Sequence, residues 1–110
     1  MSEAADGYAC EAGAQDFTAT ASRTNGERWV AVEGTCSCPT PGYELKLELA
    51  SPPFDPVPEE LHLNLVEKAP GGTVIQPITP TPAKGKFRIT DEVERVLIRN
   101  RGLSVLIKEA

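Results

Sequence analysis

The fold class follows from residues 43–49, YELKLEL, in which apolar and charged side chains alternate strictly. On an extended chain the four apolar residues would lie on one face and the three charged residues on the other. This period of two predicts a half-buried β-strand with one face in water. Residues 61–65, LHLNL, repeat the pattern, with His62 and Asn64 expected to face the solvent.

Turn residues separate the other strand-like runs. Asn25-Gly26 is the strongest hairpin signal, because both residues tolerate positive φ in a two-residue turn. Gly102 is suited to a left-handed position in a last hairpin, and Pro70-Gly71-Gly72 indicates a turn after the strand at 61–65. The further strands that we expect span residues 17–21, 29–32, 73–78, 86–89, 93–100 and 103–108.

Residues 91–101 allow a second interpretation. Thr90 could cap a helix there, with Asp91 and Glu92 near its positive end and Gly102 as its stop. The unbroken apolar run at 96–98 favours a strand instead. The strand is the favoured interpretation, and the helix stays open at this point.

These patterns together predict an all-β domain. Ten prolines and nine glycines leave little room for long helices. About seven to eight short strands between turns are typical of a two-sheet antiparallel β-sandwich. We expect residues 16–110 to form this single domain. The proline-rich stretch 52–58 would cross between its sheets, because four of its residues lack a backbone donor.

The charge distribution sets the first residues apart. They are acidic and rich in Ala and Gly, with no apolar periodicity, so we expect residues 1–15 to be a flexible acidic tail. The net charge of -5 argues against non-specific binding to nucleic acid or to an anionic membrane. Neither a signal peptide nor an apolar run of roughly 20 residues is visible. The chain reads as soluble and cytoplasmic, or as secreted or periplasmic if an export signal has been removed.

Three cysteines leave three interpretations open. Cys36 and Cys38 are two residues apart, so both sulfurs would lean to the same side of an extended chain. With Cys10 as a third ligand, they could bind Zn or Cu(I). Alternatively, Cys10 forms a disulfide with Cys36 or Cys38 and leaves one thiol free. The third interpretation is three reduced, packed cysteines in a cytosolic protein.

The motifs that identify common enzymes are missing. The chain has no Gly-x-Ser-x-Gly, P-loop, Rossmann glycine run or His-Glu-x-x-His. His62, the only histidine, has no Ser or Cys partner at motif spacing. The basic residues of the second half are interleaved with acidic ones and lack an aromatic platform. We therefore expect neither an enzyme nor a nucleic-acid partner, and no cofactor apart from the metal considered above.

Residues 38–43, CPTPGY, stand out as a candidate surface. Two prolines stiffen this loop directly ahead of the strand at 43–49, and Tyr43 begins the buried face of that strand. The segment is either a rigid strand entry with Tyr43 as an anchor in the core, or a loop presented to a partner. A pre-stiffened backbone loses less entropy on docking. The candidate partner-binding residues are Pro39, Thr40, Pro41, Gly42 and Tyr43.

Pro39-Thr40 and Gly42-Tyr43 resemble the Pro-Thr-x-Gly-Tyr loop of small bacterial immunoglobulin-like domains. Two families have such a loop: the PrcB C-terminal-like domains of protease complexes, and the chagasin-type cysteine-protease inhibitors. The first is closer in layout, over roughly residues 27–90. Its layout corresponds here to a strand ending in Gly at 29–34, a Pro-x-Gly turn at 70–72, a Val-x-Gln strand at 74–76 and a Thr-Pro step at 79–80.

The resemblance implies an immunoglobulin-like fold and a surface that presents a loop. Our leading hypothesis is a non-catalytic interaction module that offers residues 38–43 to a protein partner. In its most specific version, that partner is a protease. The alternatives are a thiol or metal-binding module built on Cys36 and Cys38, and an architectural domain without a chemical site. The sequence leaves the oligomeric state open.

Overall fold

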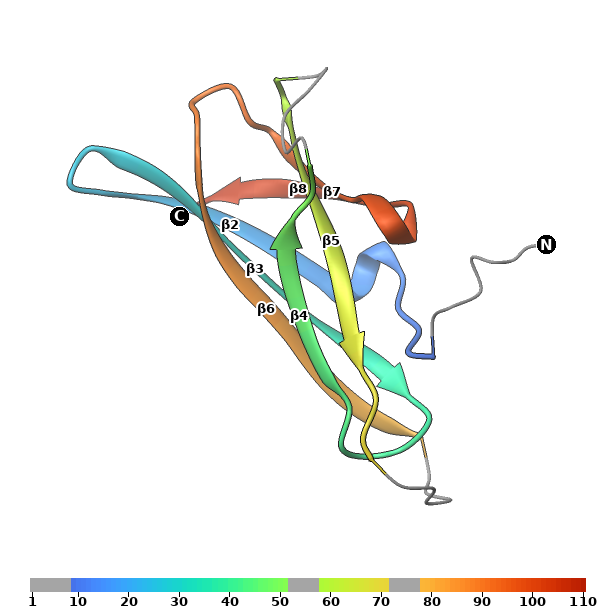
Figure 1. Cartoon of the computed structure of the whole chain (residues 1–110). Coiled ribbons are helices and arrows are strands. Elements are labelled where there is room, and N and C mark those ends of the chain that lie inside the picture. The colour runs from blue at the N-terminus through green and yellow to red at the C-terminus, as the bar shows by residue number, and fades with distance from the viewer. Residues whose placement is uncertain (1–8, 52–57, 72–77) are drawn as a thin grey trace.

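The computed structural model describes residues 9–51, 58–71 and 78–110 (Figure 1). This part of the chain contains seven strands and two single-turn 3-10 helices, so the predicted all-β class is confirmed. It includes no helix long and apolar enough to cross a lipid bilayer. In chain order the elements are η1 (Ala14–Asp16), β2 (Phe17–Thr24), β3 (Glu27–Cys38), β4 (Glu44–Leu49), β5 (Glu60–Lys68), β6 (Thr79–Ile89), β7 (Arg95–Ile98), η2 (Arg99–Arg101) and β8 (Leu103–Glu109).

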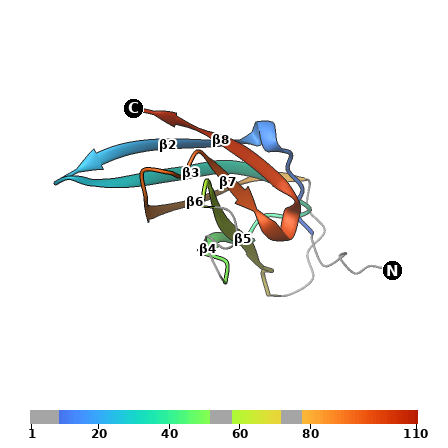
Figure 2. The same ribbon diagram turned by 90° about the horizontal axis from the view of Figure 1, so that it is seen from above.

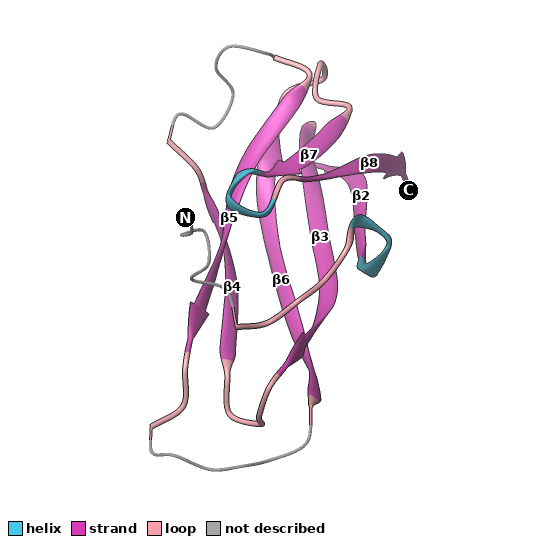
Figure 3. Cartoon of the chain, turned by 90° about the vertical axis from the view of Figure 1, so that its right-hand side faces the viewer, coloured by secondary structure: helices cyan, strands magenta, loops and turns pink. Residues whose placement is uncertain are grey.

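The strands form one mixed sheet in the order β4-β5-β7-β8-β2-β3-β6. Its two end strands, β4 and β6, lie next to each other, so the sheet nearly closes on itself (Figure 3). β2 and β8 run parallel, as do β5 and β7. The prediction of a purely antiparallel arrangement is therefore wrong. Both parallel pairs join strands that are not connected by a hairpin, because other strands intervene along the chain.

β8 belongs to both halves of this sheet. Residues 103–106 pair with β7 in antiparallel fashion, and residues 107–109 pair with β2 in parallel fashion. Figure 2 shows β8 running from η2 in the same direction as β2, toward the end of β2 that joins the hairpin with β3. The hydrogen bonding therefore continues from one half of the molecule to the other through this strand.

The hairpin between β2 and β3 confirms the prediction made from Asn25-Gly26. Both residues have positive φ, 54° and 82°, and Thr24 pairs with Glu27 directly across the turn. This hairpin lies at the end of the molecule opposite the connection between β3 and β4 (Figure 1).

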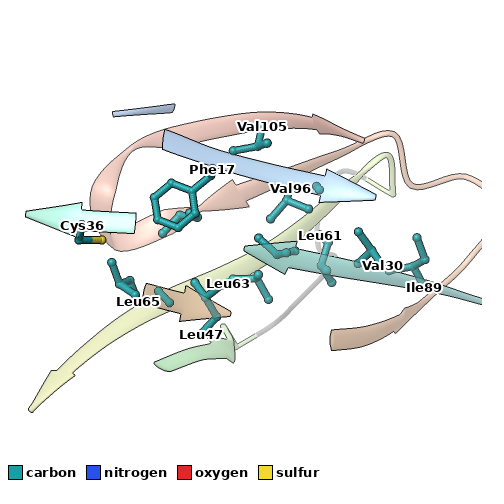
Figure 4. Close-up of a cluster of buried hydrophobic side chains, with 14 of the residues drawn as sticks. Phe17, Val30, Cys36, Leu47, Leu61, Leu63, Leu65, Ile89, Val96 and Val105 are labelled. Atoms are coloured by element: carbon teal, nitrogen blue, oxygen red, sulfur yellow. The ribbon is translucent and has the colours of Figure 1, made fainter. Parts of the chain in front are cut away.

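Alternate residues of the strands supply a single apolar core (Figure 4). Leu47 and Leu65 are buried as their alternation predicts, whereas Leu49 is 52% exposed at the end of β4. The ring of Phe17 covers Gly34, its partner in the register of β2 and β3. Among the largest fully buried side chains are Leu61, Leu63, Ile98, Val30, Val32, Val93 and Val96.

The segment 91–101 contains a strand, and the helical alternative is wrong. Only residues 95–98 pair as β7, and η2 follows as one 3-10 turn that ends at Gly102 with a φ of 66°. The Asn100 amide then takes the place of a strand beside Leu65. Its Oδ1 accepts the Leu65 N–H at 3.0 Å, and its Nδ2 donates to the Leu65 carbonyl at 2.8 Å.

β6 is longer than the strand expected at 86–89, because it begins at Thr79 and passes through two prolines. Pro80 and Pro82 are two residues apart, so their missing N–H groups face the same edge. β6 has a hydrogen-bonded neighbour on one side only, and the open side tolerates proline. The strand expected at 73–78 and the crossover at 52–58 lie, apart from Ile78 and Pro58, outside the described residues.

Residues 9–15 belong to the segment expected to be a solvated tail, and this described part is not detached from the sheet. Cys10 is fully buried. Glu11 forms an isolated antiparallel bridge with Ser37 in β3. The packed part of the chain therefore begins before the boundary that we expected at residue 16.

Candidate functional site

The loop at residues 38–43 lies where four strands end, at the lower end of Figure 1. The last residue of β3 pairs with the first residue of β6, and the first residue of β4 pairs with the last residue of β5. The loop therefore adjoins residues 69–71, which follow β5, and Ile78, which precedes β6. We call residues 39–43, 69–71 and Ile78 the tip.

A disulfide anchors the first side of the tip. Cys10 and Cys38 are bonded, with their Cα atoms 4.1 Å apart, and both side chains are fully buried. Of the cysteine interpretations, the structure contains the disulfide, with Cys38 rather than Cys36 as the partner of Cys10. Because Cys38 is the last residue of β3, the bond fixes the position at which the loop leaves the sheet.

Gly42 and Tyr43 anchor the second side. Gly42 has a φ of 99° and lies against the ring of Pro70, which follows β5. The half-buried Tyr43 packs against the core cluster, as expected for the first residue of the alternating strand. The loop is thus held at both ends, and only its middle projects.

The middle of the tip is exposed and apolar. Pro39, Pro41 and Gly42 are exposed, and Thr40 is half-buried. Ile78 is 72% exposed and adds a large aliphatic side chain to this surface. No sequence signal marks Ile78 as exposed, because an apolar residue next to a strand has the same pattern as a core residue.

Charged residues are missing from the sequence around the tip. Residues 34–43 and 69–83 contain none, although charged residues make up 25% of the chain. Lys68 and Glu44, which pair with each other across β4 and β5, directly adjoin tip residues in sequence. The tip residues therefore include no charged side chain, whereas Glu44, Lys68 and Glu11, which pairs with Ser37, border the tip.

Cys36 is the free thiol, and it is fully buried in β3 two residues before Cys38. Burial is the main cause that raises the pKa of this thiol above its ordinary value, so it stays protonated near neutral pH. Among the described residues no group of three His, Cys, Asp or Glu side chains is placed to hold a metal ion. A site made from Cys36, Cys38 and Cys10 would need the disulfide to be reduced, and it stays a prediction.

His62 does not face the solvent as its alternation indicates, because its side chain is buried. Its Nδ1 lies 2.6 Å from Nη2 of Arg99, and its Nε2 lies 3.0 Å from Oε1 of Glu60. A guanidinium group only donates, so Nδ1 accepts and Nε2 carries the proton. The alternation rule places a side chain on a face but does not show what covers that face.

The cluster around His62 ties strands together and lies near the start of β5, away from the tip. Arg95 in β7 donates from Nε to the second oxygen of Glu60 at 2.9 Å. Arg99 also donates to the carbonyl of Ser51 at 3.1 Å. Hydrogen bonds from His62 and Arg95 hold the pKa of Glu60 below its ordinary value. Both ring nitrogens of His62 are already engaged, so neither is open to a substrate.

A shallow hollow lies at the other end of the molecule, beside the β2–β3 hairpin. It has a volume of about 370 Å³ and is lined by Asn25, Glu27, Trp29 and Lys86, among others. The Lys86 ammonium lies over the Trp29 ring, 5.7 Å from its centroid. The Lys86 ammonium thus occupies one face of the Trp29 ring in a cation–π contact.

Scans of the chain against protein-family models, curated proteins and solved structures found no match. The function is therefore inferred from the residues of this chain and their arrangement.

Proposed function

We propose that this chain is a non-catalytic protein-interaction module that presents residues 38–43 to a protein partner. The observation that supports the proposal is the tip, which is exposed, uncharged and anchored on both sides. Single exposed apolar residues are ordinary on a protein surface. A group of them at one end of a small domain is typical of an interaction site.

The rigidity of the loop favours binding. Pro39 and Pro41 restrict the backbone of the projecting part, and the Cys10–Cys38 disulfide and Tyr43 hold its ends. A loop that is already ordered loses less conformational entropy when it docks. The exposed side chains are short or cyclic, except for Ile78, so few rotatable bonds are immobilised at the interface.

We further propose that the partner is a protease and that the sheet is a variant of the two-sheet immunoglobulin-like sandwich. One feature supports the sandwich: β8 pairs first with β7 and then with β2, so it passes from one half of the sheet to the other. The resemblance of Pro39-Thr40 and Gly42-Tyr43 to the loop of protease-associated domains supports a protease. A projecting, uncharged loop also suits a concave cleft, which is the usual form of an active site.

The narrow form of the proposal is that the partner is a protease. A panel of cysteine, serine and metalloproteases, each titrated with the intact oxidised chain, tests this form. We expect inhibition of at least one member. Pro41→Asp should weaken this inhibition about tenfold or more, because a charge placed in an apolar contact must be desolvated. Thr24→Asp is the control, since Thr24 is also exposed but lies beside the opposite hairpin turn. It should inhibit as the parent does.

The general form of the proposal is that the loop at residues 38–43 binds a protein partner of any class. A photo-crosslinking residue at position 41, compared with the same residue at position 24, tests this form in an extract of the source cells. We expect a protein adduct from position 41 only. Inhibition by none of the proteases contradicts the narrow form. Equal labelling from both positions, or binding of the chain to neutral lipid vesicles instead of protein, contradicts the general form.

A further inference from the structure

Residues 9–11 are held against the sheet by backbone hydrogen bonds. Glu11 and Ser37 exchange two of them: the Glu11 N–H donates to Ser37 at 2.9 Å, and the Ser37 N–H donates to Glu11 at 2.8 Å. The segment lies beyond the start of β2, which begins at Phe17 opposite Gly34. It therefore covers the edge of β3 that β2 leaves open.

Glu67 and Arg101 form a cradle for the same segment. The Glu67 carboxylate accepts the N–H groups of Ala9 and Cys10 at 3.0 and 2.9 Å. Arg101 pairs with Glu67 and donates to the carbonyl of Cys10 at 2.8 Å. The side chains of Glu67 and Arg101 are only 11% and 6% exposed. Two charged groups of β5 and η2 are thus directed at the backbone of residues 9 and 10.

The disulfide is the covalent part of this arrangement. It joins Cys10, between these hydrogen bonds, to Cys38, where the tip loop begins. One bond therefore controls two segments: the N-terminal segment on the β3 edge and the first anchor of the loop. Without it, residues 9–11 are held by the bridge between Glu11 and Ser37, by the hydrogen bonds to Glu67 and Arg101, and by the packing of the buried Cys10 side chain in the core.

We propose that Cys10–Cys38 is a redox latch, whose reduction releases residues 9–11 and the first anchor of the tip while the sheet stays folded. The reductant is a dithiol. One of its sulfurs, as the thiolate, attacks a sulfur of the disulfide, and the other cysteine leaves as a thiolate that takes up a proton. The second thiol of the reductant then closes its own disulfide and frees the first cysteine. Two cysteine thiols and one oxidised dithiol result.

The Cys36 thiol does not attack the Cys10–Cys38 disulfide. It lies two residues from Cys38, but its thiol is buried and protonated, and the thiolate is the form that attacks a disulfide. The latch sulfurs are also fully buried, so a dithiol reaches them only when the N-terminal segment opens locally. Reduction of the folded chain is therefore slow, and a variant that lacks the bond gives the cleaner test.

Hydrogen exchange of the full chain, followed by NMR for single amides, tests the proposal. The oxidised parent, the dithiothreitol-reduced parent and Cys10→Ser are compared. We expect the amides of Glu11 and Ser37 to exchange about tenfold faster or more in the last two, because local opening becomes easier. The amides of central β5 should change by less than about twofold. Cys36→Ala, which keeps the disulfide, should match the oxidised parent.

Two outcomes overturn the latch. Unchanged exchange at Glu11 and Ser37 would mean that the Glu67–Arg101 cradle holds the segment by itself. Faster exchange throughout β5, or loss of the folded spectrum both in Cys10→Ser and after reduction, would mean that the disulfide holds the whole fold together. Release of the first anchor should also weaken partner binding. This expectation rests on the proposed function and is tested separately, as weaker crosslinking from position 41. Released segments with unchanged crosslinking refute that effect but leave the latch intact.

Discussion

Gly42 lies so close to Pro70 that a Cβ atom on Gly42 would be 2.9 Å from the Cβ of the proline. The backbone of Gly42 also has a φ of 99°, which side-chain-bearing residues rarely adopt. The loop after β3 and the loop after β5 are thus packed together at the tip through a residue that has no side chain.

Gly42→Ala should therefore destabilise the protein by about 1–2 kcal/mol, from the strained φ together with the contact to Pro70. Urea unfolding followed by circular dichroism measures the change. Gly71→Ala is the control, because a Cβ at Gly71 meets no atom within 4 Å. Equal stability of the two variants would show that Gly42 tolerates a side chain.

Asn100→Ala should lower the free energy of unfolding by about 1–3 kcal/mol, because it leaves the N–H and the carbonyl of the buried Leu65 without their shared partner. Asn100→Asp distinguishes the contributions of the two hydrogen bonds to Leu65. It keeps an acceptor for the N–H but places a carboxylate oxygen against the Leu65 carbonyl. We expect the aspartate variant to recover part of the loss at low pH, where its carboxyl group is protonated and can donate. Unfolding midpoints at pH 7 and pH 3 would show whether this recovery occurs.

The contribution of Glu60 to the stability of the folded protein should depend on pH. Its pKa is lowered by hydrogen bonds from His62 and Arg95, so the folded state favours the charged carboxylate. The stabilisation is complete above the pKa of an unfolded glutamate, about 4.3, and is lost as the pH falls through the lower pKa of the folded state. Glu60→Gln should thus be less stable than the parent at pH 7, and the difference should shrink below about pH 4. A difference that does not change between pH 7 and pH 3 would contradict this linkage.

Gly34→Ala should destabilise the core by about 1–3 kcal/mol, since the new Cβ would lie 2.2 Å from the Phe17 ring. Phe17→Leu removes that ring and makes room for the methyl group. The two changes together should cost less than the sum of the single changes, by about 0.5 kcal/mol or more. Additive losses in a double-mutant cycle would show that the ring and the glycine are not in direct contact.

The sequence reveals those features of the fold that depend on neighbours along the chain. Alternation at 43–49 and 61–65 predicts β4 and β5, and Asn25-Gly26 predicts the β2–β3 hairpin. The length of β6 could not be predicted in the same way. Proline excludes a central strand but not an edge strand, and only the order of the strands shows that β6 lies at an edge.

The candidate site was only partly predictable for a related reason. Residues 39–43 are contiguous, so their turn residues and prolines identify them as one loop. Cys36 and Cys38 are equivalent by alternation, and the path of residues 9–11 along β3 decides which of them meets Cys10. His62 was misplaced because Arg99, which covers it, is 37 residues away in the chain.

The two-sided pairing of β8 has a consequence for synthesis on the ribosome. Among the described strands, β8 alone joins β7 to β2, and it leaves the ribosome after all the others. A nascent chain that still lacks β8 can form the β2–β3–β6 and β4–β5–β7 groups, but no hydrogen-bonded ladder connects them. The last pairing brings Ala19 to Ile107, across most of the chain. Because such distant contacts form slowly, this ladder is completed last, and until then the packing of β4 against β6, without hydrogen bonds, links the two groups.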